Sequence, residues 1–276
     1  MNYKTLMQEI DGLVAEANFA LRNDVRVLLD KAYRLEKNKR AKKALSWIIE
    51  NAELAAGQHL AICQDTGLPV IFIEAGKTIR LDAGVVECIK DRVEKSYQKY
   101  SLRPSLVDPL RRGRASFSGA LCNIEFKPDV KGLRITVLPK GFGCENKSQL
   151  KMFNPTAQIG EIESFIVDCV RNAGPEACPP FVVGVGIGGT ADHALLLAKK
   201  ALLNRVDTPN RDRELRYLEQ RLLKKINSLG IGPMGLGGSA TALAVKIKKL
   251  PTHIAGFPVG VNISCHALRS ATAIIK

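Results

Sequence analysis

The chain has 276 residues, of which 46% are apolar and 25% are charged, as is typical of globular proteins. This length is enough for one large domain or two small ones with a substantial core. The longest apolar run, at residues 181–187, is far too short to span a bilayer, so we expect no membrane association. The N-terminal segment carries Glu9, Asp11 and Glu16 and lacks the apolar stretch of a signal peptide, which predicts a cytoplasmic protein.

The net charge of +14 has several interpretations. It can reflect solvated helix surfaces, an acidic partner subunit, an anionic substrate or nucleic acid. The densest basic stretches, at residues 34–43 and 111–114, have no interleaved aromatic residues, and aromatic residues make up only 5% of the chain. A surface that stacks on bases needs such residues, so nucleic-acid binding is the less favoured alternative.

The first third of the chain is predicted to be mostly helical. Apolar residues recur at helical spacing over residues 45–56, with charged residues on the opposite side. A short strand is expected at residues 70–74, followed by an amphipathic helix over residues 81–93. Cys88 lies on the apolar side of that helix, which favours a role in core packing.

The middle of the chain combines strands and helices. Residues 121–126 and 133–138 alternate in polarity like half-buried strands, and a turn at residues 129–132 separates them. Residues 162–170 carry apolar side chains at helical spacing, and Cys169 belongs to that apolar face. We therefore interpret Cys169, like Cys88, as a structural residue.

The last third begins with a buried strand at residues 181–187 and a helix at residues 194–203. A polar loop at residues 207–212 leads to a helix that ends near residue 226, and glycine-rich loops with short apolar runs follow. The order of elements lacks a regular strand–helix–strand alternation, which predicts the α+β class rather than a doubly wound fold. We expect a single domain over residues 1–276, with a division into two lobes as an alternative.

Two glycine patterns are candidate nucleotide sites. Gly184-x-Gly186-x-x-Gly189 matches a dinucleotide fingerprint, but this pattern alone is weak, and Asp207 lies in a polar loop rather than at a strand end. Dinucleotide binding therefore stays a minor alternative. Residues 232–239 have the spacing of a P-loop, but Gly238 stands where the phosphate-binding lysine is required, which excludes an NTPase.

The seven cysteines indicate neither a disulfide framework nor a zinc ribbon, because their number is odd and no CxxC pair occurs. Cys63, Cys178 and Cys265 differ from the others, since they lie at the ends of expected elements among glycine, proline and polar residues. Such positions carry functional groups more often than core positions do. Three thiolates could hold three irons of a 4Fe–4S cluster and leave the fourth iron open, although their spacing follows no general rule.

Several long motifs resemble those of the class I fumarase-type hydro-lyases, in order, from about residue 4 to residue 275. They are Ala61-Ile-Cys-Gln-Asp-Thr-Gly-Leu-Pro-Val70, Gly143-Cys-Glu-Asn-Lys-Ser148, Cys178-Pro-Pro-x-x-Val-Gly-Val-Gly-Ile-Gly-Gly-Thr190, Gly230-Ile-Gly-Pro-Met-Gly-Leu-Gly-Gly238, Pro251-Thr-His-Ile-Ala255 and Cys265-His-Ala-x-Arg269. The resemblance covers the α region of the family and ends before its β region.

The resemblance implies a helical N-terminal part, followed by mixed strands and helices around a cluster-binding cleft. It implies an α subunit that hydrates fumarate to malate reversibly, with a separate β subunit as partner in an α2β2-type assembly and a small dicarboxylate as substrate. The open iron of the 4Fe–4S cluster would act as a Lewis acid. The implied metal ligands are Cys63, Cys178 and Cys265; the implied substrate-binding residues are Gln64, Arg103 and Gly143; and the implied catalytic pair is Asp65 and His253.

The sequence also departs from the family at three places. The family's Asn-Thr-Gly-Asp-Asn-Thr-Pro run corresponds here to residues 113–120, which have lost nearly all of its polar groups. Its Gly-Gly-Lys-Thr reads Gly237-Gly-Ser-Ala240, and Ser270 stands where the family often has histidine. These changes leave the cysteines in place, so alternatives to fumarate hydration are a tartrate or methylated-dicarboxylate dehydratase α subunit, or a divergent paralogue of low activity.

Overall fold

The computed structural model describes residues 3–276, which divide into two compact units. Unit 1 contains the described residues up to Leu21, Ala52–Phe142 and Arg269–Lys276. Unit 2 contains Arg22–Asn51 and Gly143–Leu268. Each unit has its own sheet and its own hydrophobic core and is described by itself.

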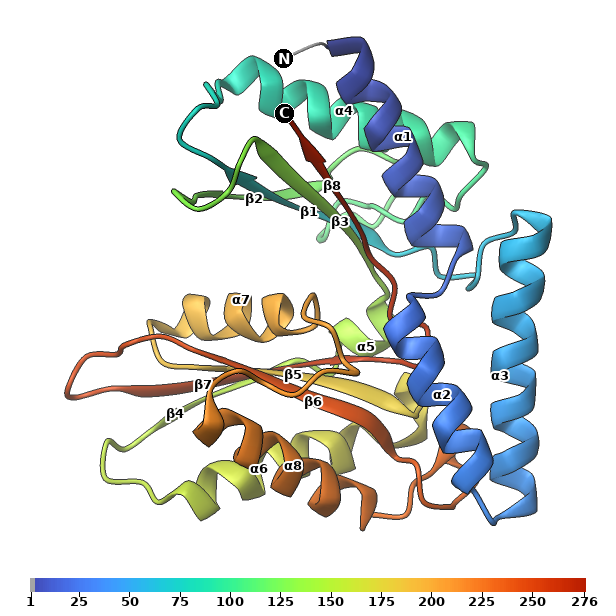
Figure 1. Ribbon diagram of the computed structural model, residues 1–276, viewed down its shortest axis with the longest axis vertical. Helices are drawn as coiled ribbons and strands as arrows, with labels where there is room; N and C mark the ends of the chain where they lie inside the picture. The colour runs from blue at the N-terminus through green and yellow to red at the C-terminus, as the bar shows by residue number, and fades with distance from the viewer. Residues whose placement is uncertain (1–2) are drawn as a thin grey trace. The chain divides into compact units, whose positions relative to one another are not determined.

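Unit 1 is built on a four-stranded sheet in the order β2-β1-β3-β8. The strands are β1 (Leu68–Ala75), β2 (Leu121–Phe126), β3 (Leu133–Lys140) and β8 (Ala271–Ile275). β2 pairs with β1 in parallel, whereas β3 is antiparallel to both β1 and β8. The helices α1 (Tyr3–Phe19) and α4 (Ala83–Lys99) cover one face of this sheet (Figure 1).

The core of unit 1 follows from the apolar face of α4. Asp82 caps this helix, because its carboxylate accepts a hydrogen bond from the Val85 amide at 3.0 Å. Val85, Ile89 and Val93 recur every four residues and are at most 3% exposed, so one side of the helix packs into the core.

Unit 2 is built on a second four-stranded sheet, in the order β4-β7-β5-β6. The strands are β4 (Gln149–Phe153), β5 (Phe181–Ile187), β6 (Ala242–Lys249) and β7 (Phe257–Ser264). The helix α7 (Ala191–Ala201) lies on one face, and α6 (Ile159–Ala173) and α8 (Arg213–Asn227) lie on the other (Figure 1).

The remaining helices are short or connecting elements. α2 (Asn23–Leu35) belongs to unit 2, and α3 (Lys39–Gln58) begins in unit 2 and ends in unit 1. α5 (Phe142–Glu145) and the two 3-10 turns, Gly174–Ala177 and Pro233–Gly235, complete the elements. No helix within residues 3–276 is long and apolar enough to cross a membrane.

Glycines let α7 approach its sheet very closely. A Cβ atom on Gly184 would lie 2.1 Å from the Ala198 carbonyl oxygen, and one on Gly186 would lie 2.1 Å from that of Ala194. Gly260 of β7 faces the same helix, where a Cβ would lie 2.7 Å from the Ala194 carbonyl carbon. Two glycines of the dinucleotide-like pattern therefore have a packing role.

The predicted α+β class is confirmed, as are the helices and strands expected before residue 142. Cys169 is fully buried, as expected for a structural residue, whereas Cys88 is only half-buried. The strands β4, β6, β7 and β8 were not predicted. β6 and β7 are buried on both faces, so they lack the alternation that marks a half-buried strand.

Candidate active-site loops

The loop that precedes β1 carries Cys63, Gln64 and Asp65. Backbone amides fix the Asp65 carboxylate, because Gly67 donates to Oδ1 at 3.0 Å and Phe142 donates to Oδ2 at 2.8 Å. Each carboxylate oxygen keeps a second lone pair for another partner. Gln64 is exposed and Asp65 is half-buried, so both can meet a ligand from solvent.

Arg103 lies in the loop after α4, with its side chain exposed. Its backbone is held by Thr66, whose hydroxyl accepts from the Arg103 amide at 3.1 Å and donates to the Arg103 carbonyl at 3.3 Å. Tyr97 Oη donates to the Thr66 carbonyl at 3.1 Å. The structure thus brings Gln64, Asp65 and Arg103, which the sequence predicted as site residues, onto two directly connected loops of unit 1.

Arg269 supports the same region from the C-terminal end of the chain. Its guanidinium donates to the Asp65 carbonyl, and its side chain is only 4% exposed. The Cys265-His-Ala-x-Arg269 motif ends at this arginine, which therefore connects the C-terminal motif to the loop of Asp65.

Gly143, a predicted substrate contact, opens a segment that unit 2 fixes at several points. Gly143 itself is exposed. Lys199 Nζ donates to Glu145 at 2.6 Å, and the Asn262 amide donates to Glu145 at 2.9 Å and to Ser148 at 2.8 Å. Sequence reasoning missed Lys199 and Asn262, since no local pattern marks residues that reach this segment from α7 and β7.

Cys178 and Cys265 belong to neighbouring loops of unit 2. The His266 amide donates to the Cys178 carbonyl at 3.4 Å, and its Nδ1 lies 3.0 Å from the same oxygen. A carbonyl oxygen only accepts, so Nδ1 carries the proton in that contact. Cys178 has a φ of 55°, a backbone conformation that residues other than glycine rarely adopt. Residues in this conformation cluster at functional sites.

His253 lies in an exposed loop between β6 and β7. Its Nδ1 accepts from the Ala255 amide at 3.2 Å, which leaves Nε2 to carry the proton of the neutral ring. Thr252 donates to the Gly189 carbonyl at 3.0 Å, and the Gly189 amide donates to the Pro251 carbonyl at 3.1 Å. The last glycine of the dinucleotide-like pattern therefore anchors the loop that carries His253.

The three predicted cluster ligands are all half-buried, and none of the seven cysteines, which lie within residues 3–276, forms a disulfide. Cys63 belongs to unit 1, whereas Cys178 and Cys265 belong to unit 2. Within either unit, no three His, Cys, Asp or Glu side chains of the described residues are grouped to hold a metal ion. The donor set fits an iron–sulfur cluster by its chemistry, because cysteine thiolates are the ligands that hold such clusters.

Two other cysteines are poor candidates for ligation because burial disfavours their thiolates. Burial raises the pKa of Cys169 to about 12. Burial also raises the pKa of the Cys122 thiol, against the opposing effect of Lys90. A metal-binding cysteine must be deprotonated, so these positions suit packing better than coordination.

The loop that lacks the family's polar run is held to α4 by one carboxylate. Glu94 accepts from the amides of Gly119, at 2.8 Å, and Ala120, at 3.3 Å. Residues 111–114 of this loop are exposed and basic. The loop is therefore ordered by its backbone, whereas its side chains offer few neutral polar groups.

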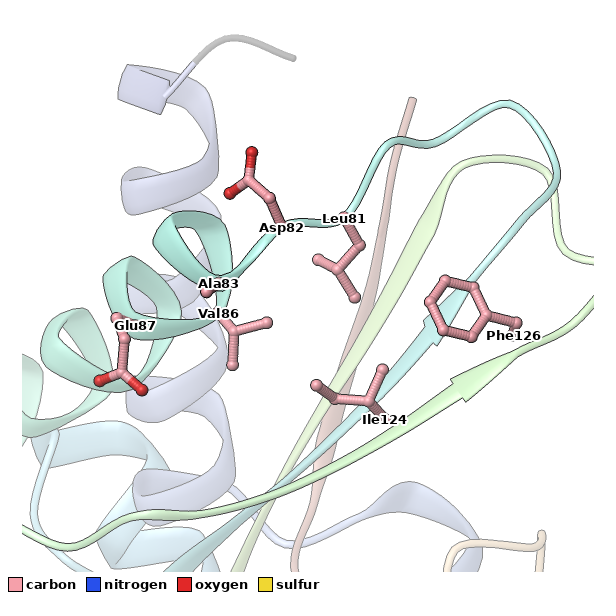
Figure 2. Close-up of a pocket in the computed structure, with 7 residues that line it drawn as sticks. All are labelled: Leu81, Asp82, Ala83, Val86, Glu87, Ile124 and Phe126. Atoms are coloured by element: carbon pink, nitrogen blue, oxygen red, sulfur yellow. The ribbon is translucent and has the colours of Figure 1, made fainter.

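A separate apolar pocket lies at the far end of the unit 1 sheet. The Asp65 loop precedes Leu68 at the start of β1, whereas Phe126 of the pocket pairs with Ala75 at the end of β1. Figure 2 shows its apolar side chains facing a common hollow; the pocket is lined by Leu81, Asp82, Ala83, Val86, Glu87, Ile124 and Phe126. It is not part of the predicted site.

Comparison with known proteins agrees with the resemblance seen in the motifs. Residues 7–274 match the sequence profile of the family described as "Fumarate hydratase (Fumerase)". This match covers almost the whole chain and includes every predicted site residue. The chain belongs to the fumarate hydratase family, in its class I form.

Individual relatives carry two kinds of name. A Methanocaldococcus jannaschii protein, provisionally named L(+)-tartrate dehydratase subunit alpha, is 44% identical over 96% of this chain and 95% of its own length. A Geobacillus stearothermophilus protein, provisionally named fumarate hydratase class I, is 33% identical over 96% of this chain but only 54% of its own length. The L(+)-tartrate dehydratase subunit alpha of Escherichia coli K12 is 29% identical over 83% of this chain and 77% of its own.

Proposed function

We propose that the chain is the α subunit of a two-subunit, cytoplasmic 4Fe–4S hydro-lyase that interconverts fumarate and malate. The observation that supports the two-subunit part is the naming of relatives: the chain matches 95% of a protein named as an alpha subunit, and a second relative has the same kind of name. A separate β subunit would be the partner, in an α2β2-type assembly.

The cluster would be held by Cys63, Cys178 and Cys265. When bound, its open iron supplies a Lewis acid for a substrate hydroxyl and carboxylate. The half-buried positions of the three cysteines and the unusual backbone of Cys178 support this role. His266 fixes the Cys178 carbonyl and so orients one ligand loop.

Arg103 would bind a substrate carboxylate through two parallel hydrogen bonds, which the planar guanidinium allows and an ammonium does not. Its exposed side chain and its fixed backbone support this role. Gln64 would donate from its amide to the same dicarboxylate, and the exposed backbone of Gly143 leaves room for the substrate to approach.

Asp65 and His253 would hold and move the proton that leaves with water. The Asp65 carboxylate is oriented by two amide donors, so its remaining lone pairs point in fixed directions. His253 would exchange its proton at Nε2, since the Ala255 amide occupies Nδ1. Asp65 belongs to unit 1 and His253 to unit 2, and each would play its own part in the proton transfer.

L(+)-tartrate is the second candidate substrate. Two observations favour it: the family's polar run is missing at residues 113–120, and two of the relatives described above are named for tartrate. Fumarate hydration and tartrate dehydration both break or form a C–O bond beside a carboxylate, so the same ligands and the same arginine would serve either reaction.

Anaerobic reconstitution tests the cluster. The protein is purified without oxygen, supplied with iron and sulfide, and examined by visible absorbance and iron content. We expect a brown protein whose colour fades in air, and loss of that colour in Cys63→Ala, Cys178→Ala and Cys265→Ala. Cys88→Ala is the matched control and should retain the cluster. A colourless wild-type protein would count against the proposal.

Coexpression with a β chain tests the activity. The purified complex is assayed for hydration of fumarate and for dehydration of malate and L(+)-tartrate, and the α chain alone is assayed in parallel. We expect activity only in the complex, with one substrate clearly preferred. Steep, salt-sensitive retention of the α chain on a polyanion, without activity in the complex, would instead favour nucleic-acid binding.

A further inference from the structure

One hydroxyl group links the loop of Asp65 to the loop of Arg103. Thr66 Oγ1 accepts from the Arg103 amide at 3.1 Å and donates to the Arg103 carbonyl at 3.3 Å. A single side chain thus pairs with both polar backbone groups of Arg103, as a neighbouring strand would. Thr66 is 3% exposed, so solvent cannot readily replace these hydrogen bonds.

Tyr97 makes a second connection between the same two loops. Its hydroxyl donates to the Thr66 carbonyl at 3.1 Å, and its own carbonyl accepts from the Leu102 amide at 2.9 Å. Burial raises the pKa of Tyr97 to about 12, so the phenol stays a donor at any ordinary pH. The residue before Arg103 and the residue after Asp65 are therefore held by one buried tyrosine.

Asp65 is fixed independently of these contacts. Arg269 donates to its carbonyl, and the amides of Gly67 and Phe142 donate to its carboxylate. One end of the connection is thus rigid. The other end, Arg103, has an exposed side chain, so only its backbone can be placed in advance of substrate binding.

We propose that Thr66 is a positioning residue that sets where Arg103 presents its guanidinium relative to the Asp65 carboxylate. The inference rests on the proposed function for the roles of Arg103 and Asp65. A dicarboxylate must be held at both of its ends while a proton is added to or removed from a carbon between them, and a small displacement of one binding group weakens catalysis strongly. Because the Arg103 backbone is ordered beforehand, substrate binding loses less conformational entropy.

Three substitutions separate the hydroxyl from general packing. Thr66→Val keeps the shape of the side chain and removes both hydrogen bonds, whereas Thr66→Ser keeps the hydroxyl. Thr136→Val is the matched control: Thr136 is also buried in unit 1, but its hydroxyl pairs with Thr272 at 2.8 Å, between β3 and the edge strand β8.

Hydrogen exchange at the Arg103 amide gives a readout that needs no activity. We expect exchange in Thr66→Val to be at least about tenfold faster than in the wild type, because the acceptor of that amide is lost. Thr66→Ser and Thr136→Val should exchange like the wild type. Equal protection of Arg103 in Thr66→Val and wild type would overturn the proposal. Should Thr66→Val fail to fold, Thr66→Ala removes the same two hydrogen bonds and provides the comparison.

Kinetics of the reconstituted complex then test the link to substrate binding. Thr66→Val should raise KM for the dicarboxylate by about tenfold, with a smaller change in kcat, and should add little in an Arg103→Ala background. An equal effect of Thr66→Val in both backgrounds would overturn the proposal. Lack of activity in the wild-type complex would refute the proposed function instead, and the exchange result would still decide the part played by Thr66.

Discussion

The thiol of Cys144 donates a hydrogen bond to the carbonyl oxygen of Ala177 at 3.2 Å. Cys144 is 6% exposed, and Ala177 immediately precedes Cys178, one of the three proposed cluster ligands. The contact ties the segment that begins at Gly143 to the backbone of a ligand loop. A serine hydroxyl at this position could donate to the same carbonyl.

Cys144→Ser should therefore be tolerated, with a change in the free energy of unfolding below about 1 kcal/mol. Cys144→Ala leaves the Ala177 carbonyl without this donor and leaves a small cavity, so it should cost about 2 kcal/mol. Urea denaturation of the apoprotein measures both. Iron content after anaerobic reconstitution should also fall in Cys144→Ala.

The same substitution of cysteine by serine at another position serves as the control. Cys169 is fully buried on the apolar face of α6, so Cys169→Ser should destabilise the protein by about 1–2 kcal/mol, more than Cys144→Ser does. Equal costs at the two positions would show that the hydrogen bond to Ala177 contributes nothing measurable.

Asp11 makes the stability of unit 1 depend on pH in the acid range. Burial alone would raise its pKa, but hydrogen bonds from Arg92, Lys99 and Ser96 lower it to about 2, from an ordinary value of 3.8. A carboxyl whose pKa is lower in the folded state stabilises the fold above its unfolded pKa and loses that effect as the pH falls. The lowered pKa corresponds to about 2 kcal/mol of the free energy of unfolding at neutral pH.

We expect Asp11→Asn to be about 2 kcal/mol less stable than the wild type at pH 7, and the difference to shrink by about half at pH 3. Asp91→Asn is the control, because Asp91 forms an exposed pair with Lys95 on the same helix and should change stability by less than about 0.5 kcal/mol. Denaturant midpoints at both pH values provide the test. A stability difference between Asp11→Asn and wild type that does not change with pH would refute this role of Asp11.

Glu36, at the end of α2, organises the C-terminal glycine-rich loop. Its Oε1 accepts from the amides of Lys37, at 2.9 Å, and Asn38, at 2.8 Å. Its Oε2 accepts from the Ser239 amide at 2.8 Å and from the Ser239 hydroxyl at 3.0 Å. Ser239 stands where the family's Gly-Gly-Lys-Thr run has lysine, and both its amide and its hydroxyl donate to this carboxylate.

Glu36→Gln should destabilise the protein by about 2–3 kcal/mol, because its amide group cannot accept from all four donors. Ser239→Ala removes only one donor and should cost about 1 kcal/mol. Glu50→Gln, an exposed change on α3 in the same unit, should be nearly neutral. Burial alone would raise the pKa of Glu36, but these hydrogen bonds lower it, so the difference between Glu36→Gln and wild type should narrow in acid. A Glu36→Gln variant as stable as Glu50→Gln would contradict this account.

Much of the fold could be predicted because its helices are amphipathic and the segments that form β2 and β3 alternate in polarity. β6 shows no such alternation, because six of its residues are buried. One of these six is Lys246, which is paired with Glu219 inside the protein. β7 contains Pro258 and Gly260, which usually argue against a strand interior. Burial on both faces, rather than local preference, forms these strands.

The site divides in the same way. Cys63, Asp65 and Thr66 stand in one contiguous motif, so a resemblance could mark them. Lys199 and Asn262 meet Glu145 from 54 and 117 residues away, and only the folded chain brings them together. The assigned roles of the predicted ligands and substrate contacts stay predictions until the cluster and the partner subunit are tested.

Gly186 distinguishes a packing role from a nucleotide-binding role for the glycine pattern in β5. A Cβ atom there would lie 2.1 Å from the Ala194 carbonyl oxygen and 2.6 Å from the Ala198 nitrogen, both in the backbone of α7. Backbone atoms cannot rotate away as a side-chain tip can, so α7 would have to move off the sheet. Gly186→Ala should therefore destabilise the protein by about 3 kcal/mol.

Gly160→Ala is the matched control, because nothing lies within 4 Å of a Cβ atom at that position in the same unit. Guanidinium denaturation compares the two variants, and calorimetry with NAD measures nucleotide binding by the wild type. We expect a large loss of stability at Gly186 only, and no nucleotide binding. If Gly186→Ala were as stable as Gly160→Ala while NAD bound to the wild type, the close helix would not explain the glycine, and the dinucleotide interpretation would be preferred.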